Sequence, residues 1–129
     1  MEEECFFCKV WEEQKEKFVY DNDSFYVRLD DFPVNPGHCD IVSKRHVVSL
    51  FDLTKEEWLD LKDALKKTKE FIDKEYHPDA YNVGVNEGEA AGRTIHHLHI
   101  QFIPRYKNDV PNPKGGIRNV IPEKGDYTK

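Results

Sequence analysis

The chain has 129 residues and a formal net charge of −6, from 25 acidic and 19 basic side chains. This charge disfavours binding to duplex nucleic acid, because polyanions attract basic protein surfaces. With 38% hydrophobic residues and a mean hydropathy of −0.78, no apolar run is long enough to span a bilayer. Residues 1–4 lack the pattern of a secretion signal. We therefore expect a single cytoplasmic domain over residues 1–129.

Only three cysteines are present, and two of them, Cys5 and Cys8, have the C-x-x-C spacing. In a reducing compartment this spacing indicates metal or redox chemistry rather than a structural disulfide. Cys39 lies in a predicted strand and is expected to be a small core residue. The charged run at residues 12–17 predicts a solvated helix face or turn.

The first half of the chain predicts three strands. Residues 18–20 and 24–29 are rich in aromatic and β-branched side chains around a polar turn, which is typical of a hairpin. Residues 30–37 contain two prolines and a glycine, so they predict a loop. Residues 38–42 predict a third strand.

The next element is an amphipathic helix. Thr54, followed three residues later by Glu57, predicts a capping box at its start. Apolar residues recur near the helical period for five or six turns, until Pro78 ends the pattern. We expect this stripe to pack on a sheet as core. Its members are Trp58, Leu61, Leu65 and Ile72.

Two further strands and an arm complete the chain. Residues 81–86 and the histidine-rich stretch at residues 92–105 predict two antiparallel neighbouring strands, joined through small residues at 87–92. Residues 107–129 hold several prolines and glycines without periodicity, which is typical of a disordered tail or an extended arm, and the apolar residues among them favour the arm. The expected fold is α+β: an antiparallel sheet of about five strands packed on one long helix, with an extended C-terminal arm.

The histidine-rich strand is the strongest functional signal, since half of the six histidines lie within residues 96–99. The strand period of two places His97, His99 and Gln101 on one face, and His96 with the apolar residues on the other. A lone strand histidine is more often a hydrogen-bonded structural group. Two histidines and an amide on one face would each need a buried partner, which favours a functional site.

Several separated motifs carry a family resemblance. They are Pro36-Gly37-His38, Lys44-Arg45-His46, Asn86-Glu87-Gly88, Gly92-Arg93-Thr94 and His97-Leu98-His99-Ile100-Gln101. In their order and spacing over residues 5–105, they resemble the histidine triad (HIT) superfamily of nucleotide hydrolases and transferases. The resemblance implies a HIT-like domain with a core at residues 1–106, an arm at 107–129, a small nucleotide substrate and a homodimer.

The resemblance also implies catalytic roles. His99 would attack the α-phosphorus of an AMP-linked or dinucleoside polyphosphate substrate and form a covalent nucleotidyl-histidine, which requires a neutral imidazole. His97 and Gln101 complete the triad positions. His38 either orients His99 or is a structural histidine.

The binding residues follow from the same resemblance. Asp30 would accept hydrogen bonds from the ribose hydroxyls, and Asn86, Arg93 and Thr94 would contact the phosphate. Asn86 can also be read as a turn residue. In the arm, Arg118 follows two glycines and would either reach a phosphate or carry surface charge.

Gln101 departs from the pattern, because most members of the superfamily have a third histidine there. Glutamine at this position resembles the uridylyltransferase and dinucleoside polyphosphate phosphorylase branches. An amide donates a hydrogen bond at any pH but cannot pass a proton to a leaving group. Nucleotidyl transfer to an acceptor such as phosphate therefore stands beside hydrolysis, and a non-catalytic, zinc-stabilised nucleotide-binding module is a further alternative.

A metal site is the last expectation. Cys5, Cys8, His46 and His97 would form a closed set of ligands for a structural Zn²⁺, as in some relatives. The alternatives are that the thiols are simply buried, or that they form a redox pair, with His96 as a competing ligand that strand parity disfavours.

Overall fold

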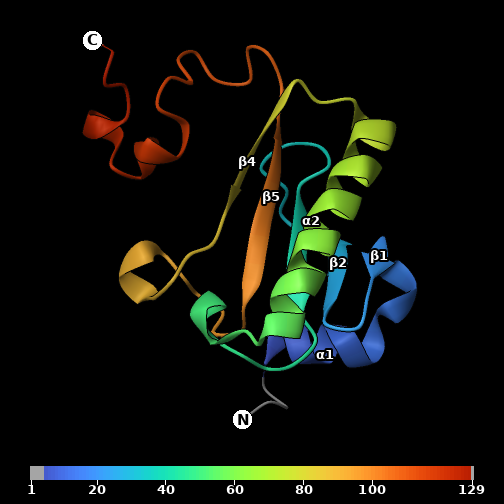
Figure 1. Ribbon diagram of the computed structural model, residues 1–129. Helices are drawn as coiled ribbons and strands as arrows, with labels where there is room; N and C mark the ends of the chain where they lie inside the picture. The colour runs from blue at the N-terminus through green and yellow to red at the C-terminus, as the bar shows by residue number, and fades with distance from the viewer. Residues whose placement is uncertain (1–4, 129) are drawn as a thin grey trace.

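The computed structural model describes residues 5–128. The prediction about a secretion signal concerns residues 1–4, which lie outside the described residues. Figure 1 shows an antiparallel sheet beside one long helix. Five strands follow the order β1-β2-β3-β5-β4. Their bounds are β1 Tyr20–Asp21, β2 Phe25–Leu29, β3 Cys39–Ser43, β4 Ala80–Gly84 and β5 His99–Arg105. The predicted α+β class is confirmed.

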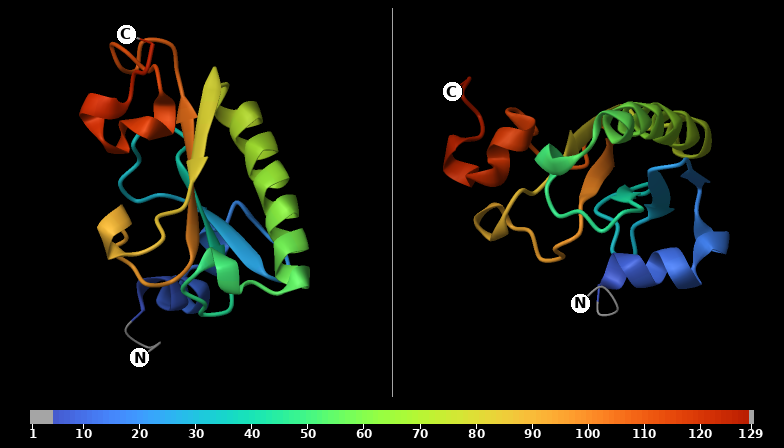
Figure 2. Two further views of the ribbon diagram at one scale, coloured as in Figure 1. Left: turned by 60° about the vertical axis from the view of Figure 1, so that its left-hand side comes forward. Right: turned by 60° about the horizontal axis from the view of Figure 1, so that its bottom comes forward.

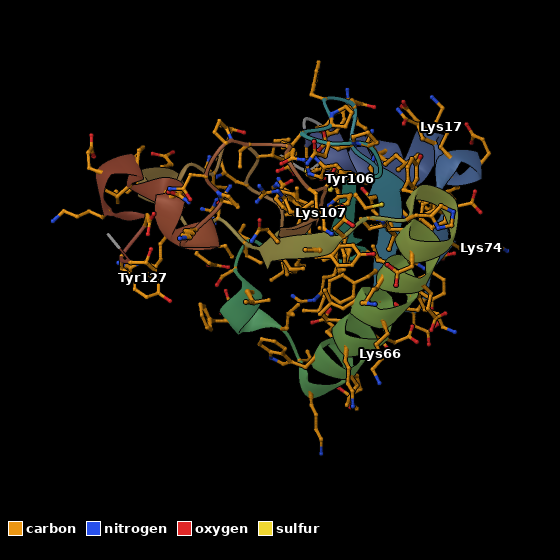
Figure 3. All side chains as sticks on the ribbon, turned by 90° about the horizontal axis from the view of Figure 1, so that it is seen from above. Lys17, Lys66, Lys74, Tyr106, Lys107 and Tyr127 are labelled. Carbon is orange, nitrogen blue, oxygen red and sulfur yellow. The ribbon has the colours of Figure 1, made fainter. Side chains whose placement is uncertain are left out.

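The long helix α2, Lys55–Tyr76, begins with the predicted capping box between Thr54 and Glu57. It covers one face of the sheet, and its buried residues are Leu61, Ala64, Thr68 and Ile72. Its lysines, such as Lys66 and Lys74, point away from the sheet (Figure 3). The prediction of Trp58 as a core residue is wrong: it is 43% exposed, because the covered stripe begins one turn later.

A second helix, α1 Phe6–Glu13, packs on the opposite face of the sheet (Figure 2). Phe7 and Val10 are buried there against Tyr26 and Val42, and the Tyr26 hydroxyl donates a 2.7 Å hydrogen bond to the Phe7 carbonyl. The sequence pattern did not predict this helix, because it has only eight residues and no side-chain cap. The charged run that follows contains a short 3-10 turn, Lys15–Lys17.

Strand β5 separates the two sides of the sheet by strict alternation. Ile100, Phe102 and Pro104 are buried, whereas His99 and Gln101 point to the other face. The strand begins at His99, so the prediction that His96, His97 and Leu98 also lie in it is wrong. His96 consequently does not join the core: its side chain is exposed and accepts a hydrogen bond from Arg93 at 3.1 Å.

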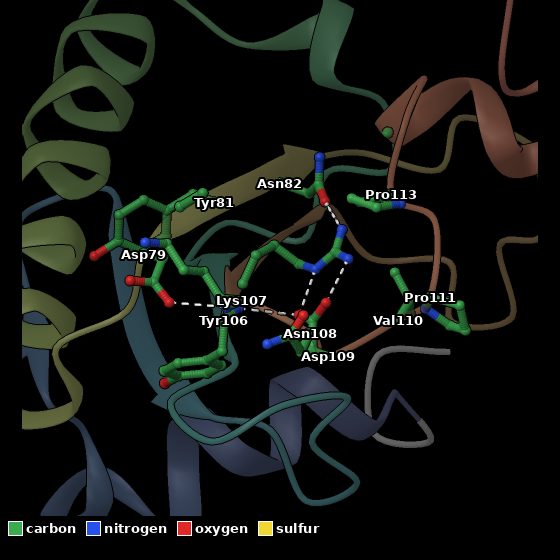
Figure 4. Close-up of a pocket in the computed structure, with 13 residues that line it drawn as sticks. Asp79, Tyr81, Asn82, Tyr106, Lys107, Asn108, Asp109, Val110, Pro111 and Pro113 are labelled. Carbon is green, nitrogen blue, oxygen red and sulfur yellow. Dashed lines mark hydrogen bonds and ion pairs between the residues drawn. The ribbon is translucent and has the colours of Figure 1, made fainter.

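The residues after β5 form an arm with two short 3-10 helices, Gly116–Val120 and Pro122–Lys124. The arm leaves β5 at the end opposite His99 (Figure 1). A cavity of about 470 Å³ lies beside it, between Asn82 of β4 and Pro113 (Figure 4). Arg105 in its wall is already paired with Asp109. Within residues 5–128, no helix is long and apolar enough to cross a membrane.

Candidate active site

His99 opens β5 on the sheet face that carries α1. Its Nδ1 lies 2.8 Å from the carbonyl oxygen of His97. A carbonyl only accepts hydrogen bonds, so Nδ1 carries the proton and Nε2 keeps its lone pair. Burial lowers the pKa of His99, which favours the neutral ring. Phe7 of α1 lies against the ring, with centroids 4.8 Å apart. The result is an oriented, neutral imidazole with one basic nitrogen.

Gln101, the next residue on this face, contacts His38. The backbone N–H of Val34 donates to His38 Nδ1 at 3.0 Å, which leaves the proton on Nε2. That Nε2–H faces Gln101 Oε1 at 2.6 Å. The side-chain carbonyl oxygen of Gln101 therefore accepts a hydrogen bond from His38, and its NH₂ group can donate to another partner. His38 thus contacts Gln101 rather than the His99 ring.

Two cross-strand rows build this face. The first consists of Tyr26, Val42 and His99, paired across β2, β3 and β5. The second row is polar and consists of Arg28, Asp40 and Gln101. Antiparallel partners at opposite positions point to the same face, so Asp40 lies between the guanidinium and the amide.

Asp30, in the loop after β2, lies above the polar row. Its Oδ1 accepts from the Phe32 backbone N–H at 2.7 Å, and its Oδ2 is 3.9 Å from His38 Nε2. Its side chain is 19% exposed, so it is accessible at the margin of the buried row. The structure therefore brings Asp30 and His38 together with Gln101, which lies 63 positions after His38 in the sequence.

The other expected binding residues lie in the loop between β4 and β5 or in the arm. Asn86 and Thr94 are exposed. The neighbouring Glu87 anchors the loop by accepting from the Ser49 hydroxyl at 2.9 Å and the Leu50 N–H at 2.6 Å. Arg118 is placed elsewhere: it donates to two carbonyls of its own arm and lies over Tyr127.

The four expected metal ligands form one cluster. His97 Nδ1 lies 3.2 Å from Cys5 Sγ, 3.6 Å from Cys8 Sγ and 3.1 Å from His46 Nδ1. Cys8 Sγ is 3.3 Å from His46 Nδ1. The other nitrogen of His97 faces the Ser43 carbonyl at 2.7 Å, which holds the ring with its lone pair toward the cluster. The cluster joins α1 to the segment that leads into β5, and it could hold a metal ion.

A family model described as "HIT domain" matches residues 12–108 of the sequence. The chain belongs to the HIT family. A HIT-like protein from Methanocaldococcus jannaschii is 35% identical over 118 residues, which cover 90% of this chain and 91% of that protein. A HIT family protein from Bacillus anthracis has a TM-score of 0.75 and 34% identity, with 82% of this chain and 77% of that chain covered.

Other HIT relatives have names that state an activity or a metal. A bis(5'-adenosyl)-triphosphatase from Dictyostelium discoideum is 38% identical over 80 residues, 62% of this chain and 54% of that protein. The match thus spans about half of that enzyme. A Zn-bound histidine triad protein from Mycobacterium smegmatis has a TM-score of 0.75 and 26% identity, with 87% of this chain and 82% of that chain covered.

Two residues of the site were not predicted from the sequence as functional residues. Arg28 and Asp40 lie in segments correctly predicted as strands, and each is almost completely buried on the face of His99. The available signal was a charged residue at an inward position of each strand, which is costly without a partner. The pairing itself depends on the register between β2 and β3 and cannot be read locally.

Proposed function

We propose that this protein is a nucleotidyl hydrolase or transferase that acts on the α-phosphate of dinucleoside polyphosphates or related AMP-linked compounds. His99 Nε2 attacks the α-phosphorus, the bond from phosphorus to the leaving oxygen breaks, and a nucleotidyl-His99 forms. Water or another acceptor then attacks the same phosphorus and releases the ring. The observation that carries the proposal is the 2.8 Å bond from His99 Nδ1 to the His97 carbonyl, which directs the lone pair of Nε2 outward.

The neighbouring groups suit the charge that this reaction develops. Gln101 has its carbonyl held by His38, so its NH₂ can donate to a phosphoryl oxygen. Asn86, Arg93 and Thr94 supply further donors from the loop before β5. Asp30 accepts from the ribose hydroxyls, and a cavity of about 480 Å³ opens beside it, with Val10 and other apolar residues in its wall. Arg118 has no part in this proposal.

The decisive test is the covalent intermediate. The protein is mixed with diadenosine polyphosphate, quenched and examined by intact-mass spectrometry. We expect an adenylyl adduct in the wild type and in His96→Ala, which alters an exposed neighbouring histidine, and none in His99→Ala. Full turnover by His99→Ala would reject the mechanism. Nucleotide binding without adduct or turnover in the wild type would instead favour a non-catalytic binding module.

Gln101 favours one class of leaving group. An amide cannot protonate the departing atom, so the best substrates are those whose leaving group departs as a stable anion. A phosphate anhydride meets this condition, whereas the amine of a phosphoramidate does not. We expect higher kcat/KM for diadenosine polyphosphates than for an adenosine phosphoramidate. The Gln101→His variant should reduce the difference between the two substrates, and an unchanged ratio would contradict this role.

The same amide favours transfer to phosphate as the second candidate activity. Inorganic phosphate attacks the nucleotidyl-histidine as an anion, so it needs less help from a base than water does. A turnover assay with and without inorganic phosphate separates the two activities. AMP as the product in both conditions indicates a hydrolase, and phosphate-dependent formation of ADP indicates a phosphorylase.

We also propose that the cysteine and histidine cluster holds a structural zinc. Ligands at about 2.0–2.3 Å from a tetrahedral Zn²⁺ lie about 3.3–3.8 Å from one another. The separations of 3.1–3.6 Å in the cluster overlap this range, and the two shortest fall slightly below it. The ion would supply no catalytic chemistry, because the four side chains complete its coordination. Cys5, Cys8, His46 and His97 would tie α1 to the segment that leads into β5.

Metal analysis tests the zinc proposal. We expect about one zinc per chain in the purified protein. Cys5→Ser should lose it, and Cys39→Ala, which changes a buried thiol outside the cluster, should keep it. A metal-free wild type with a reversible disulfide between Cys5 and Cys8 would support the redox alternative.

The resemblance to HIT proteins further leads us to propose a homodimer. We also propose a cytoplasmic location, because a reducing compartment keeps the thiol ligands reduced. The elution volume of the purified protein with in-line light scattering tests the dimer. A mass of one chain across the working concentration range would contradict it.

A further inference from the structure

Asp40 is an unexplained buried carboxyl group in the middle of the active-site face. Its side chain is 2% exposed, and its Oδ2 pairs with Arg28 at 3.2 Å. Its other oxygen, Oδ1, has no hydrogen-bond partner among residues 5–128, although it is fully shielded from solvent. A buried acceptor without a donor is costly, so this oxygen needs an explanation.

Asp30 is a candidate partner for this oxygen. One carboxyl oxygen of Asp30, one carboxyl oxygen of Asp40 and one ring nitrogen of His38 lie within 4.8 Å of one another. Two ionised carboxylates offer acceptors only, so neither can satisfy the other. A proton placed on Asp40 turns it into a donor toward Asp30 and removes the deficit.

A metal ion is a poorer explanation for the same grouping. His38 Nδ1 accepts the Val34 N–H, so its Nε2 carries a proton and has no lone pair for a cation. Arg28 is also paired with Asp40, and a guanidinium beside the group repels a cation. A shared proton requires neither a change in the His38 ring nor the loss of the Arg28 pair.

The charge balance also supports a proton. Arg28 is the only guanidinium in direct contact with the described acidic cluster, and it serves both Asp40 and the more exposed Asp31. Together with Asp30, this makes three carboxyl groups around one guanidinium. The titratable or charged groups around the pair of Asp30 and Asp40 come from several elements. They are Tyr26 and Arg28 of β2, Asp31 of the following loop, His38 before β3, Cys39 of β3, Lys17 after α1 and His99 of β5.

The titration behaviour agrees with this geometry. Burial, followed by the hydrogen bond and charge of Asp30, raises the pKa of Asp40 to about 8. Burial alone would raise the pKa of Asp30, but a hydrogen bond donated by a protonated Asp40 and the backbone N–H of Phe32 lower it overall. Asp40 is thus the protonated member near neutral pH, and Asp30 is the ionised one.

We propose that Asp40 is a positioning residue that keeps its proton in the working protein and donates it in a hydrogen bond to Asp30. Asp30 then presents a fixed, ionised carboxylate to the ribose hydroxyls. Loss of the proton from Asp40 leaves two facing carboxylates, which repel and displace the ribose acceptor. The inference rests on the proposed function of Asp30 as a ribose acceptor, and it makes nucleotide affinity depend on the protonation of a residue that does not touch the nucleotide.

Binding measurements test the inference without requiring turnover. AMP and its 2',3'-dideoxy analogue are titrated calorimetrically into the full chain, from about pH 7 to about pH 9.5. Above the titration of Asp40, we expect the Kd of AMP to rise toward tenfold per pH unit, as for release of one proton. The dideoxy analogue lacks the ribose hydroxyls, so its Kd should stay nearly constant. An equal rise for both ligands would overturn the inference.

Variants assign the effect to Asp40. Asp40→Asn keeps a donor that cannot ionise, so the Kd of AMP should become independent of pH. Asp31→Asn removes the other carboxylate paired with Arg28 and should retain the wild-type pH dependence. A wild-type pH dependence in Asp40→Asn, or its loss in Asp31→Asn, would overturn the assignment.

A stability measurement covers the case in which AMP does not bind. The folded pKa of Asp40 is raised, so its contribution to stability is present at low pH and is lost as the pH rises toward about 8. Denaturation at several pH values should show this decline in the wild type and a flatter profile in Asp40→Asn. If AMP does not bind but the decline in stability disappears in Asp40→Asn, the protonation of Asp40 is supported and the proposed function is rejected. A decline in stability that is unchanged in Asp40→Asn would refute the claim that Asp40 is protonated in the folded protein.

Discussion

Replacing His38 separates its two hydrogen bonds, because two different amides can each reproduce one of them. The ring is 4% exposed, accepts from the Val34 N–H through Nδ1 and donates to Gln101 through Nε2. In His38→Asn, the amide oxygen takes the place of Nδ1 and keeps the bond to Val34. In His38→Gln, the longer side chain brings an NH₂ group to the place of Nε2 and keeps the bond to Gln101.

The two variants should be similarly destabilised but differ in activity. Each loses one hydrogen bond with a net value of about 1 kcal/mol, which corresponds to a fall in Tm of roughly 4 °C for a domain of this size. Only His38→Asn releases the carbonyl of Gln101 and lets the amide turn. If Gln101 donates to the phosphoryl group, kcat should fall on the order of 10²-fold in that variant. His38→Gln should retain most of the wild-type kcat.

Thermal unfolding and steady-state turnover of a diadenosine polyphosphate check both parts. His38→Ala serves as the reference that lacks both bonds, and its activity should match that of His38→Asn. If His38→Asn is as active as His38→Gln, or more active, His38 does not act through Gln101. A similar loss of activity in all three variants would indicate general damage to the site.

Three further predictions concern α2 and its surroundings. Ile72→Ala removes a fully buried side chain and should lower the free energy of unfolding by about 2–5 kcal/mol in chemical denaturation. The control Leu59→Ala, at a 60% exposed position of the same helix, should change it by less than about 0.5 kcal/mol. Thr54→Ala should cost about 1 kcal/mol through loss of the cap, and an unchanged Tm would contradict the capping role. Arg45 lowers the pKa of Glu57 from 4.5 to about 2. The depressed pKa gives stability above about pH 4.5 that is lost as the pH falls toward 2, so Glu57→Gln should lack that part of the acid-induced decline.

Local signals in the sequence predicted much of the fold. The capping box of α2 depends on residues three positions apart, and the alternation of β5 depends on neighbours two positions apart, so both patterns can be read directly. Helix α1 could not be read in this way. Its eight residues gain their stability from Phe7 and Val10 packed against the sheet, and those partners lie in distant strands.

The site shows the same division. The two-residue alternation of side chains along a strand placed His99 and Gln101 on one face. The resemblance to HIT proteins predicted the four residues of the metal cluster. The contact between His38 and Gln101 joins residues 63 positions apart and depends on the pairing of β3 with β5. The pair of Arg28 and Asp40 likewise depends on register. Neither contact follows from residue types alone.

Strand register is therefore a condition for the proposed activity as well as for stability. On one face of β2, β3 and β5, the facing residues Val27, Ile41 and Ile100 pack beneath α2. On the other face, the same pairing aligns the polar row that ends at Gln101. A shift of one strand by one residue would bury charged groups under the helix and turn apolar side chains toward the substrate. The hydrophobic core thus disfavours the one-residue shifts that would separate His99, Gln101 and Asp40, and packing under α2 fixes the geometry of the candidate site on the opposite face.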